Sequence, residues 1–529
     1  MRTSNYFTSS LLSLLACTLL VVGACSKKIN NANEIRFRLP GDPPSIDWSL
    51  ATDNVSKEVI VNLMEGLLEP DENAHIKPAM AESWSLSPDG KTYTFKLRNG
   101  IVWSDGVKLT ASHFVDSWER QLNAKTASEY AYFLFDIVGA EDYQKGTLKD
   151  FAQVGVKAID ELTLEVKLRN PVAYWLNIPT FWVTYPIRKD VVAKYGDKWT
   201  DPANIVTAGA YKLISYERDS KIVLEKNPTY YRKEFLDQMP PRIVFRVVKD
   251  DATAVALYKN HDLDIVRDLP PIQIPDLSKR PDFVVSPLLR GFYIGFSFKD
   301  PQTADPKIRL ALAQAIDRSQ LKNLINAFGT PSKTWNQPTL IGYDPNIGVD
   351  FNPASAKKIF SELKNKPTTI ELWYDQKELN RIVVENLQAQ WKNNLGIDVK
   401  LLNQEWKVYL KTLQTKTPPI YRLGWGADYP DPDTFMALFT CGSGNNMGGF
   451  CNKKYDALIH QAGATTKTEE RAKAYAEAEK LLLEQDVAIL PLFSQTNLHL
   501  VSERISGFKV NPMGDFSMKS LKIKTGGAR

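Results

Sequence analysis

Segments with strand periodicity and segments with helix periodicity alternate along this chain, and that alternation restricts its fold more than any other feature. Residues 92–98 and 162–168 alternate apolar and polar side chains, as a strand with one buried face does. Asp305 followed by Pro306 is a typical helix start, and apolar residues recur at helical spacing behind it. Interleaved strands and helices predict an α/β architecture in which helices cover sheets.

Two more helices are predicted in the last third of the chain, and each leads into a strand. The first has an apolar face, ends before Gly396 and is followed by a strand over 397–401. The second begins after Thr468 and precedes an apolar strand over 488–493.

Composition excludes several classes of protein. The chain has 43% hydrophobic and 24% charged residues, which is ordinary for a soluble globular protein and not for a disordered, collagen-like or multi-span membrane protein. The formal charge of +5 comes from interspersed signs without a basic block, so no nucleic-acid partner is expected. Aromatic residues reach 11%, which favours a protein that contacts a ligand through ring faces.

The first 33 residues predict export and membrane attachment. Residues 1–24 combine one early positive charge with a short apolar run, which is typical of a signal peptide and too short to span a membrane. Cys25 follows small residues and resembles the acylation site of a bacterial lipobox, so residues 25–33 would be a polar, lipid-anchored tether. An ordinary signal peptide with an incidental cysteine is the alternative. We expect a protein anchored to the membrane, in the bacterial periplasm or at the cell surface.

Two cysteines remain after removal of the signal peptide and acylation of Cys25. Cys441 and Cys451 flank a loop of small residues, and such a pair in an oxidising compartment predicts a disulfide. A zinc site is the alternative, but it would need two further ligands and His460 is the only one nearby in sequence. We therefore expect no metal and no cofactor.

Motifs of the common enzyme classes are missing. The five histidines are scattered, and no Gly-x-Ser-x-Gly nucleophile elbow occurs. Asp428, Asp431 and Asp433 could suggest calcium, but the segment lacks the glycine and the terminal glutamate of an EF-hand loop. Paired carboxylates are common in a chain with 61 acidic residues, so a secreted hydrolase stays an alternative. The prediction is a protein that is not an enzyme.

An ordered set of short motifs resembles one known family. The motifs are Ala81-Glu82-Ser83-Trp84, Ser87-x-Asp89-Gly90-Lys91, Trp103-Ser104-Asp105-Gly106, Thr126-Ala127-Ser128-x-Tyr130, Thr207-x-Gly209-Ala210-Tyr211, Asn403-Gln404-Glu405-Trp406 and Gly424-Trp425-x-Ala427-Asp428-Tyr429. Their order and their spread over the mature chain resemble the extracytoplasmic oligopeptide-binding proteins of ABC importers, solute-binding protein family 5.

The resemblance implies a two-lobed, periplasmic-binding-protein-like (type II) fold with a hinge and an additional domain inserted in the first lobe. Lobe I would comprise residues 34–64, 187–289 and 497–529, the inserted domain 65–186, and lobe II 290–496. Proteins of this kind hold an extended peptide between the lobes, where it pairs like an added strand, and deliver it to a membrane permease. A monomer is expected.

The resemblance also implies which residues bind the peptide. Asp428 lies where the family keeps the acid that pairs with the α-amino group of the ligand, and Arg422 lies where a planar guanidinium can meet a ligand carboxylate. A loop acid and a surface arginine are the alternatives for these two. The other predicted peptide-binding residues are Trp425, Trp406, Tyr130, Tyr293, Asn380 and Gly209. For each tyrosine, a place in the core is the alternative.

Two departures from the family pattern concern the binding site, and a third, His113 in place of the usual acid after Thr110-Ala111, concerns only a helix start. Asn380 stands where well-studied oligopeptide binders have a histidine that can meet a carboxylate, so the preferred peptide length stays open. Arg290 and Gly426 occupy the two positions of a disulfide found in the enteric branch, and that bridge is absent here. The cation at Arg290 could bind an acidic side chain or a carboxylate, a role that Arg422 could fill instead.

The sequence therefore predicts the substrate-binding lipoprotein of an ABC peptide transporter, which captures short peptides in a cleft between lobes and delivers them to the permease. Relatives of this fold that bind dipeptides, murein peptides, nickel chelates or oligosaccharides are the nearest alternatives. A signalling or chaperone role of the same fold is another, and a secreted hydrolase is the alternative from a different class. Asp428 together with Arg422 favours peptides, because a sugar offers no pair of opposite charges to them.

Overall fold

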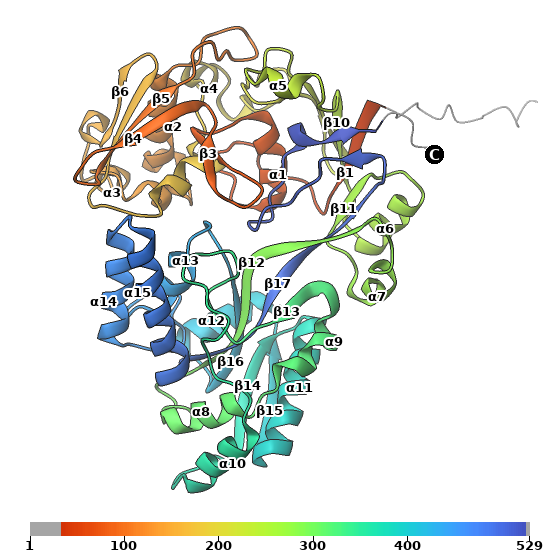
Figure 1. Ribbon diagram of the computed structural model, residues 1–529. Coiled ribbons are helices and arrows are strands. Elements are labelled where there is room, and N and C mark those ends of the chain that lie inside the picture. Colours follow the sequence, from red (N-terminus) through yellow and green to blue (C-terminus); the bar gives the residue numbers. More distant parts are fainter. Residues whose placement is uncertain (1–32, 525–529) are drawn as a thin grey trace, which may run out of the picture.

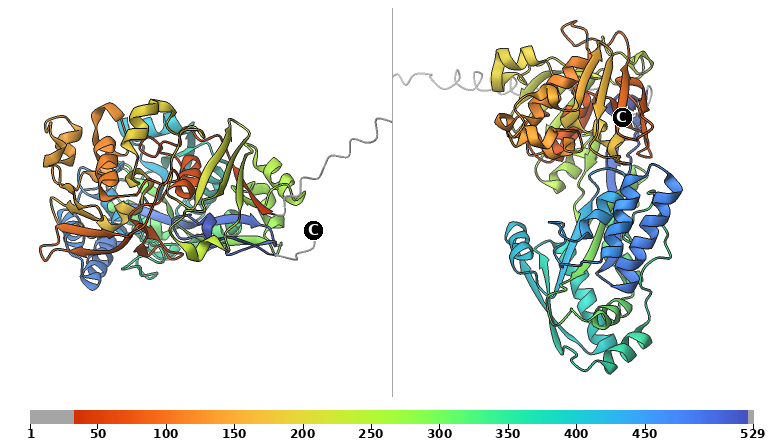
Figure 2. Two further views of the ribbon diagram at one scale, coloured as in Figure 1. Left: turned by 90° about the horizontal axis from the view of Figure 1, so that it is seen from above. Right: turned by 90° about the vertical axis from the view of Figure 1, so that its left-hand side faces the viewer.

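Two lobes joined by a pair of long strands make up the structure, a computed structural model that describes residues 33–524. The connecting strands are β12 (Phe283–Phe296) and β17 (Ile489–Val501). They run side by side from one lobe to the other in Figure 1, and the right-hand view of Figure 2 shows the lobes stacked on either side of them. The predicted two-lobed α/β fold is confirmed.

One sheet of 11 strands runs through both lobes. Its order is β15-β14-β16-β12-β17-β11-β1-β10-β9-β8, and β13 pairs with β17 off this path. The other strands of the sheet are β1 (Glu34–Leu39), β8 (Tyr211–Glu217), β9 (Lys221–Lys226), β10 (Arg242–Val247), β11 (Ile265–Arg267), β13 (Gly329–Pro331), β14 (Thr369–Asp375), β15 (Asp398–Gln404) and β16 (Ile420–Gly426). Because the sheet passes from lobe II to lobe I through β12 and β17, these strands form the hinge.

The hinge strands are irregular where they cross between the lobes. Their antiparallel pairing shifts register between Pro287 and Gly291, and such irregularities bend and twist a strand pair. The predicted strand over 488–493 is confirmed, but β17 continues to Val501. Residues 495–497 are polar and end the apolar run in the sequence, because they line the cavity described below and not the core.

The predicted inserted domain contains a separate sheet in the order β4-β5-β7-β6. Its strands are β4 (Ala81–Leu86), β5 (Thr92–Leu97), β6 (Val156–Asp160) and β7 (Thr163–Lys167), and a hairpin pairs β2 (Leu68–Pro70) with β3 (Ile76–Pro78). The two alternating segments of the sequence are therefore confirmed as strands. Helix α2 (Ala111–Leu122) covers this sheet and begins with a capping box, in which the His113 ring accepts a hydrogen bond from the Thr110 N–H at 3.0 Å.

Helices surround the main sheet in both lobes. Lobe I has α1 (Asn54–Leu63), α4 (Lys189–Tyr195), α5 (Lys233–Leu236), α6 (Asp251–Lys259) and α7 (Ile274–Leu277), and the inserted domain adds α3 (Ala140–Gln144). Lobe II has α8 (Pro306–Gln314), α9 (Leu321–Ile325), α10 (Pro353–Glu362), α11 (Glu378–Leu395), α12 (Trp406–Thr415), α13 (Asp433–Met436), α14 (Lys453–Ala464) and α15 (Thr468–Lys480). The three helices predicted in lobe II are confirmed, and Gly396 ends α11 in the left-handed conformation that favours glycine.

The hydrophobic cores follow the lobes. One contiguous cluster of buried side chains joins lobe I to the inserted domain, and a smaller cluster lies in lobe I around α6 and α7. Two others lie in lobe II, one of them together with Leu289 from the predicted end of lobe I. The inserted domain therefore shares its core with lobe I and does not have one of its own. The exact domain boundaries stay predictions.

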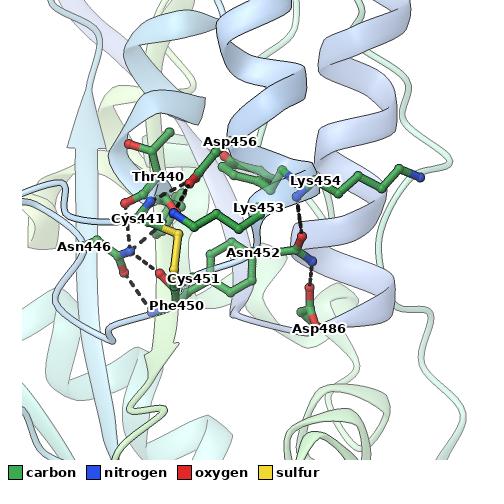
Figure 3. Close-up of a disulfide and its surroundings, with 12 residues drawn as sticks. Thr440, Cys441, Asn446, Phe450, Cys451, Asn452, Lys453, Lys454, Asp456 and Asp486 are labelled. Atoms are coloured by element: carbon green, nitrogen blue, oxygen red, sulfur yellow. Dashed lines mark hydrogen bonds and ion pairs between the residues drawn. A yellow bond between two sulfur atoms is a disulfide. The ribbon is translucent and has the colours of Figure 1, made fainter.

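The predicted disulfide is confirmed between Cys441 and Cys451, in the loop before α14 (Figure 3). Asn446 holds the loop between them, since its side-chain amide donates to the Phe450 carbonyl at 2.6 Å. The two sulfurs bond each other, and so they are not free to hold zinc.

The signal peptide, Cys25 and all but the last residue of the tether lie outside the described residues. Within residues 33–524, no helix combines the length and the apolar character that a membrane span requires.

Candidate ligand-binding cleft

A cavity of about 700 Å³ lies between the lobes. Lobe I contributes the start of α1, lobe II the end of β16, and both hinge strands form part of the wall. Its lining includes residues 52–54, 57–58, 181–182, 288–290, 424–428, 495–499 and 513–515. A second cavity of about 380 Å³ adjoins it and shares Lys57, Glu58, Trp182, Asp428 and Asp515. Each volume lies in the range that small-molecule sites occupy.

Asp428 borders both cavities, just beyond the end of β16. Its backbone N–H donates to the Thr434 hydroxyl at 3.1 Å, which fixes the turn that follows the strand. No cationic side chain among residues 33–524 pairs with its carboxylate. Burial raises the pKa of Asp428 to about 6, against a smaller opposing effect of its hydrogen bond with Thr434. An unpaired, partly desolvated carboxylate in a cavity is a site for a cation.

Aromatic side chains surround Asp428. Tyr130 reaches the cavity from the inserted domain and donates its hydroxyl proton to the Thr52 carbonyl at 2.9 Å. Burial, and next the negative charge of Asp428, raise the pKa of Tyr130, and both residues line the cavity. Trp425 lines the same cavity from β16. The structure therefore brings together three of the predicted site residues.

Phe181 and Trp182 also line the cavity, and sequence reasoning missed them. Their rings stack with centroids 4.2 Å apart, and the Trp182 indole N–H donates to the Ala51 carbonyl at 2.9 Å. The dense run of aromatic residues over 174–185 was the available signal.

Arg422 and Asn380 do not line either cavity, although both are predicted site residues. The Arg422 guanidinium pairs with the Asp375 carboxylate at 3.0 Å and lies over the Phe292 ring, 4.3 Å from its centroid. Asn380 donates to the same Asp375 oxygen at 2.8 Å. All three polar side chains are buried, so they form a closed network behind the cleft wall. The alternative prediction, that Arg422 is a surface arginine, is wrong, because its side chain is buried.

Three further predicted residues lie away from the cavities. Tyr293 is in the core, with its ring 4.9 Å from that of Trp335, as the core alternative predicted. Trp406 is 44% exposed at the start of α12. Gly209 is buried against α1, where a β-carbon would lie 2.6 Å from the Leu63 carbonyl. The structure thus gives Gly209 a packing role, and the ligand roles of all three stay predictions.

The other charged side chains of the cleft are mostly paired with each other. Lys57 pairs with Asp515, and Arg267 pairs with Glu58, whose pKa burial raises. Arg290 lines the main cavity and has no carboxylate partner within the described residues. It lies opposite Gly426 in the β12–β16 pair. These are the two positions that the family resemblance predicts to be neighbours, because a disulfide joins them in the enteric branch.

Comparisons with known proteins agree with this geometry. The Escherichia coli K12 periplasmic oligopeptide-binding protein OppA is 34% identical over 500 residues, which cover 90% of this chain and 89% of that protein. The unliganded open form of the periplasmic murein tripeptide binding protein MppA has a TM-score of 0.84 at 29% identity, with 93% and 97% of the two chains covered. Haemophilus influenzae OppA in complex with the peptide RPPGFSPFR has a TM-score of 0.71 at 32% identity, covering 93% and 99%.

A family model matches residues 75–447, which is more than half of the chain. The matching model is that of the bacterial extracellular solute-binding proteins, family 5, and it overlaps the inserted domain, the hinge strand β12 and the segment that holds Asp428. The chain therefore belongs to the bacterial extracellular solute-binding proteins of family 5, which are binding proteins and not enzymes.

Proposed function

We propose that this protein is the substrate-binding component of an ABC importer and captures short peptides in the interlobe cleft. The observation that carries the proposal is the unpaired Asp428 carboxylate at the junction of the two cavities. Relatives named for oligopeptides, dipeptides and murein peptides support the ligand class.

Peptides of varied sequence share a cationic amino end, and Asp428 offers a partner for that end. An ammonium–carboxylate pair away from bulk water is stronger than one on a surface, although removing water from both ions offsets part of the gain. The aromatic residues around Asp428 add contact area that tolerates different side chains. The free N-terminus is thus the feature that the site recognises, and the peptide sequence matters less.

Ligand capture would involve closure of the lobes about β12 and β17. The similarity to the unliganded open form of MppA, with a TM-score of 0.84, exceeds that to the peptide complex of Haemophilus influenzae OppA, at 0.71. The chain therefore has the shape of an open, ligand-free receptor. Closing the hinge would bring rings of the inserted domain, such as Trp182, onto a peptide bound at Asp428.

Anchoring and delivery belong to the same proposal. The lipobox-like sequence at Cys25 supports lipid attachment in the bacterial periplasm or at the cell surface, with residues 25–33 as the tether. Peptide delivery to membrane permease subunits by a monomer follows from the family's role. The separate cores of the two lobes support a change of lobe close to the predicted boundaries at 289–290 and 496–497, since Leu289 packs in a core of lobe II and Leu498 in one of lobe I.

Native mass spectrometry of protein purified from its host tests the ligand class. We expect additional masses that disappear on denaturation and that fragment as short peptides with free amino ends. Recovery of oligosaccharides or metal chelates in their place would contradict the proposal, and so would failure of the unfolded and refolded protein to bind any member of a mixed peptide library.

A further inference from the structure

We propose that Arg290 binds a carboxylate of the ligand close to its amino terminus, so that the site prefers peptides with an anionic group within the first two or three residues. The proposal rests on the proposed function, since it takes Asp428 as the partner of the amino end.

Arg290 and Asp428 lie on the same face of the sheet. Arg290 is opposite Gly426 in the antiparallel β12–β16 pair, and the pairing continues when the Ala427 N–H donates to the Leu289 carbonyl at 2.8 Å. Asp428 is two residues beyond Gly426, which makes it the diagonal neighbour of Arg290, at a typical separation of about 7–8 Å between α-carbons. Both residues line the main cavity, yet no ion pair joins them.

The surface between the two charges is open. Gly426 has no side chain, and a β-carbon placed there would be 3.8 Å from the Arg290 Nε. The Arg290 side chain therefore lies over the glycine, and it is exposed where it borders the cavity. A peptide backbone advances about 3.4 Å per residue when extended, so an amino end at Asp428 places the next one or two residues beside Arg290.

Arg290 is the available cation of the cleft. The other two lysine or arginine side chains that line the main cavity are paired, Lys57 with Asp515 and Arg267 with Glu58. Arg422, the alternative partner for a ligand carboxylate, is buried and neutralised by Asp375. The walls of the cavity lower the pKa of Arg290 by desolvation, with no carboxylate among residues 33–524 to oppose the effect. A ligand carboxylate would supply the missing partner through the planar fork of guanidinium donors.

A ligand carboxylate can come from an acidic side chain or from the C-terminus of a very short peptide, and calorimetry distinguishes the two. The first arm compares amidated Ala-Glu-Ala with amidated Ala-Gln-Ala, together with versions that carry Glu or Gln at the first or third residue. The second arm compares Ala-Ala and Ala-Ala-Ala with their C-terminal amides. Each comparison changes one charge and keeps the shape, and the readout is the ratio of the two dissociation constants within one protein.

For the unchanged protein we expect the anionic member of at least one pair to bind tenfold or more tightly. Arg290→Gln should reduce that ratio to less than twofold, and Arg290→Lys should give an intermediate value because it keeps the charge and loses the fork. Arg242→Gln removes an exposed arginine of β10, far from the cleft lining, and should keep the full ratio. Thermal unfolding of each variant establishes that it is folded.

If Arg290→Gln lowers the ratio of dissociation constants in the first comparison, the carboxylate comes from an acidic side chain. If it lowers the ratio in the second, the carboxylate is the C-terminus. An equal ratio in the unchanged protein and in Arg290→Gln would overturn the proposal while peptide binding itself still held. Equal affinities for anionic and neutral peptides in the unchanged protein would do the same. A protein that bound none of these peptides would overturn both this inference and the proposed function.

Discussion

At the scale of residues, the proposed ligand chemistry depends on a single carboxylate, that of Asp428. It is half-buried, borders both cavities and lines the main cavity together with Tyr130. Its pKa of about 6 means that the protein holds a charge without a partner at neutral pH. Ligand-binding sites commonly contain a charged group that has no partner in the protein, because the ligand supplies the opposite charge.

The raised pKa of Asp428 predicts a bell-shaped pH dependence of peptide affinity. Binding requires the ionised carboxylate, so the dissociation constant should rise about tenfold per pH unit below pH 6. It should also rise above about pH 8, where the peptide amino group loses its proton. Calorimetry with one neutral peptide between pH 4.5 and pH 9 measures both limbs. Asp428→Asn should lose the acid limb, and an acid limb that survives in this variant would contradict the assignment.

The same pKa shift predicts that Asp428 destabilises the ligand-free protein. The pKa of this carboxylate is higher in the folded state than in the unfolded chain, so the free energy of unfolding falls as pH rises from about 4 to about 6. At pH 7 the carboxylate is ionised, and its charge lowers the stability of the folded protein. Asp428→Asn should therefore stabilise the free protein at pH 7 by roughly 1 kcal/mol, a value reduced for the partial exposure of the group. Urea unfolding at pH 7 and pH 4 tests this. A gain of equal size at both pH values would show that the charge is not its cause.

Sequence reasoning identified the cleft residues that lie in local motifs. It did not anticipate features that depend on partners distant in sequence. Asp428, Trp425 and Tyr130 follow motifs that fix their backbone neighbourhood, and all three line the cleft. Nothing near Arg422 in sequence shows that Asp375, on the neighbouring strand β14, neutralises it. Charge pairing is a property of the fold, so the available cation could be recognised only in three dimensions.

At the scale of elements, strands with one buried face were predicted well and the hinge strands were not. The period-two pattern of β5 and β7 matches their burial, since each packs one face on the core. β12 contains Pro287 and Gly291 and crosses between lobes, so its environment changes along its length and no single period describes it. β17 changes from core to cleft wall for the same reason.

The disulfide predicts a measurable contribution from the loop before α14. Cys441 and Cys451 are 10 residues apart, and closing a loop of that length in the unfolded chain corresponds to about 2–3 kcal/mol. The double variant Cys441→Ser, Cys451→Ser should lower the stability of lobe II by that amount in urea unfolding. Peptide affinity should change little, because neither cysteine lines the cavities. Unchanged stability of the double variant, or of the reduced protein, would contradict the predicted contribution.

At the scale of the whole molecule, the inserted domain already touches lobe II outside the hinge. The Tyr174 ring of the inserted domain stacks on Tyr429 with centroids 4.7 Å apart, and the Ala173 N–H donates to the Gly463 carbonyl at 3.1 Å. Tyr429 directly follows Asp428, so this contact lies beside the ligand site. The motif series predicted two lobes and an inserted domain, but an interlobe contact between side chains has no local sequence signal.

Lobe closure should accompany ligand capture. Adding a neutral peptide should reduce the radius of gyration by about 1 Å from the roughly 23 Å expected for a compact chain of this size. Small-angle X-ray scattering with and without peptide measures the change. Asp428→Asn should need far more peptide for the same change, whereas the exposed Asp350→Asn should behave like the unchanged protein. A radius that stays constant at saturating peptide would contradict closure about β12 and β17.

The most direct test of the central claim is calorimetry at pH 7 with one short neutral peptide and its N-acetylated form. If Asp428 holds the peptide amino group, acetylation should weaken binding by about 30-fold or more, corresponding to roughly 2 kcal/mol for a charge left without its partner. Asp428→Asn should bind the free peptide about as weakly as the unchanged protein binds the acetylated one. Equal affinity of the unchanged protein for the free and the acetylated peptide would contradict the account.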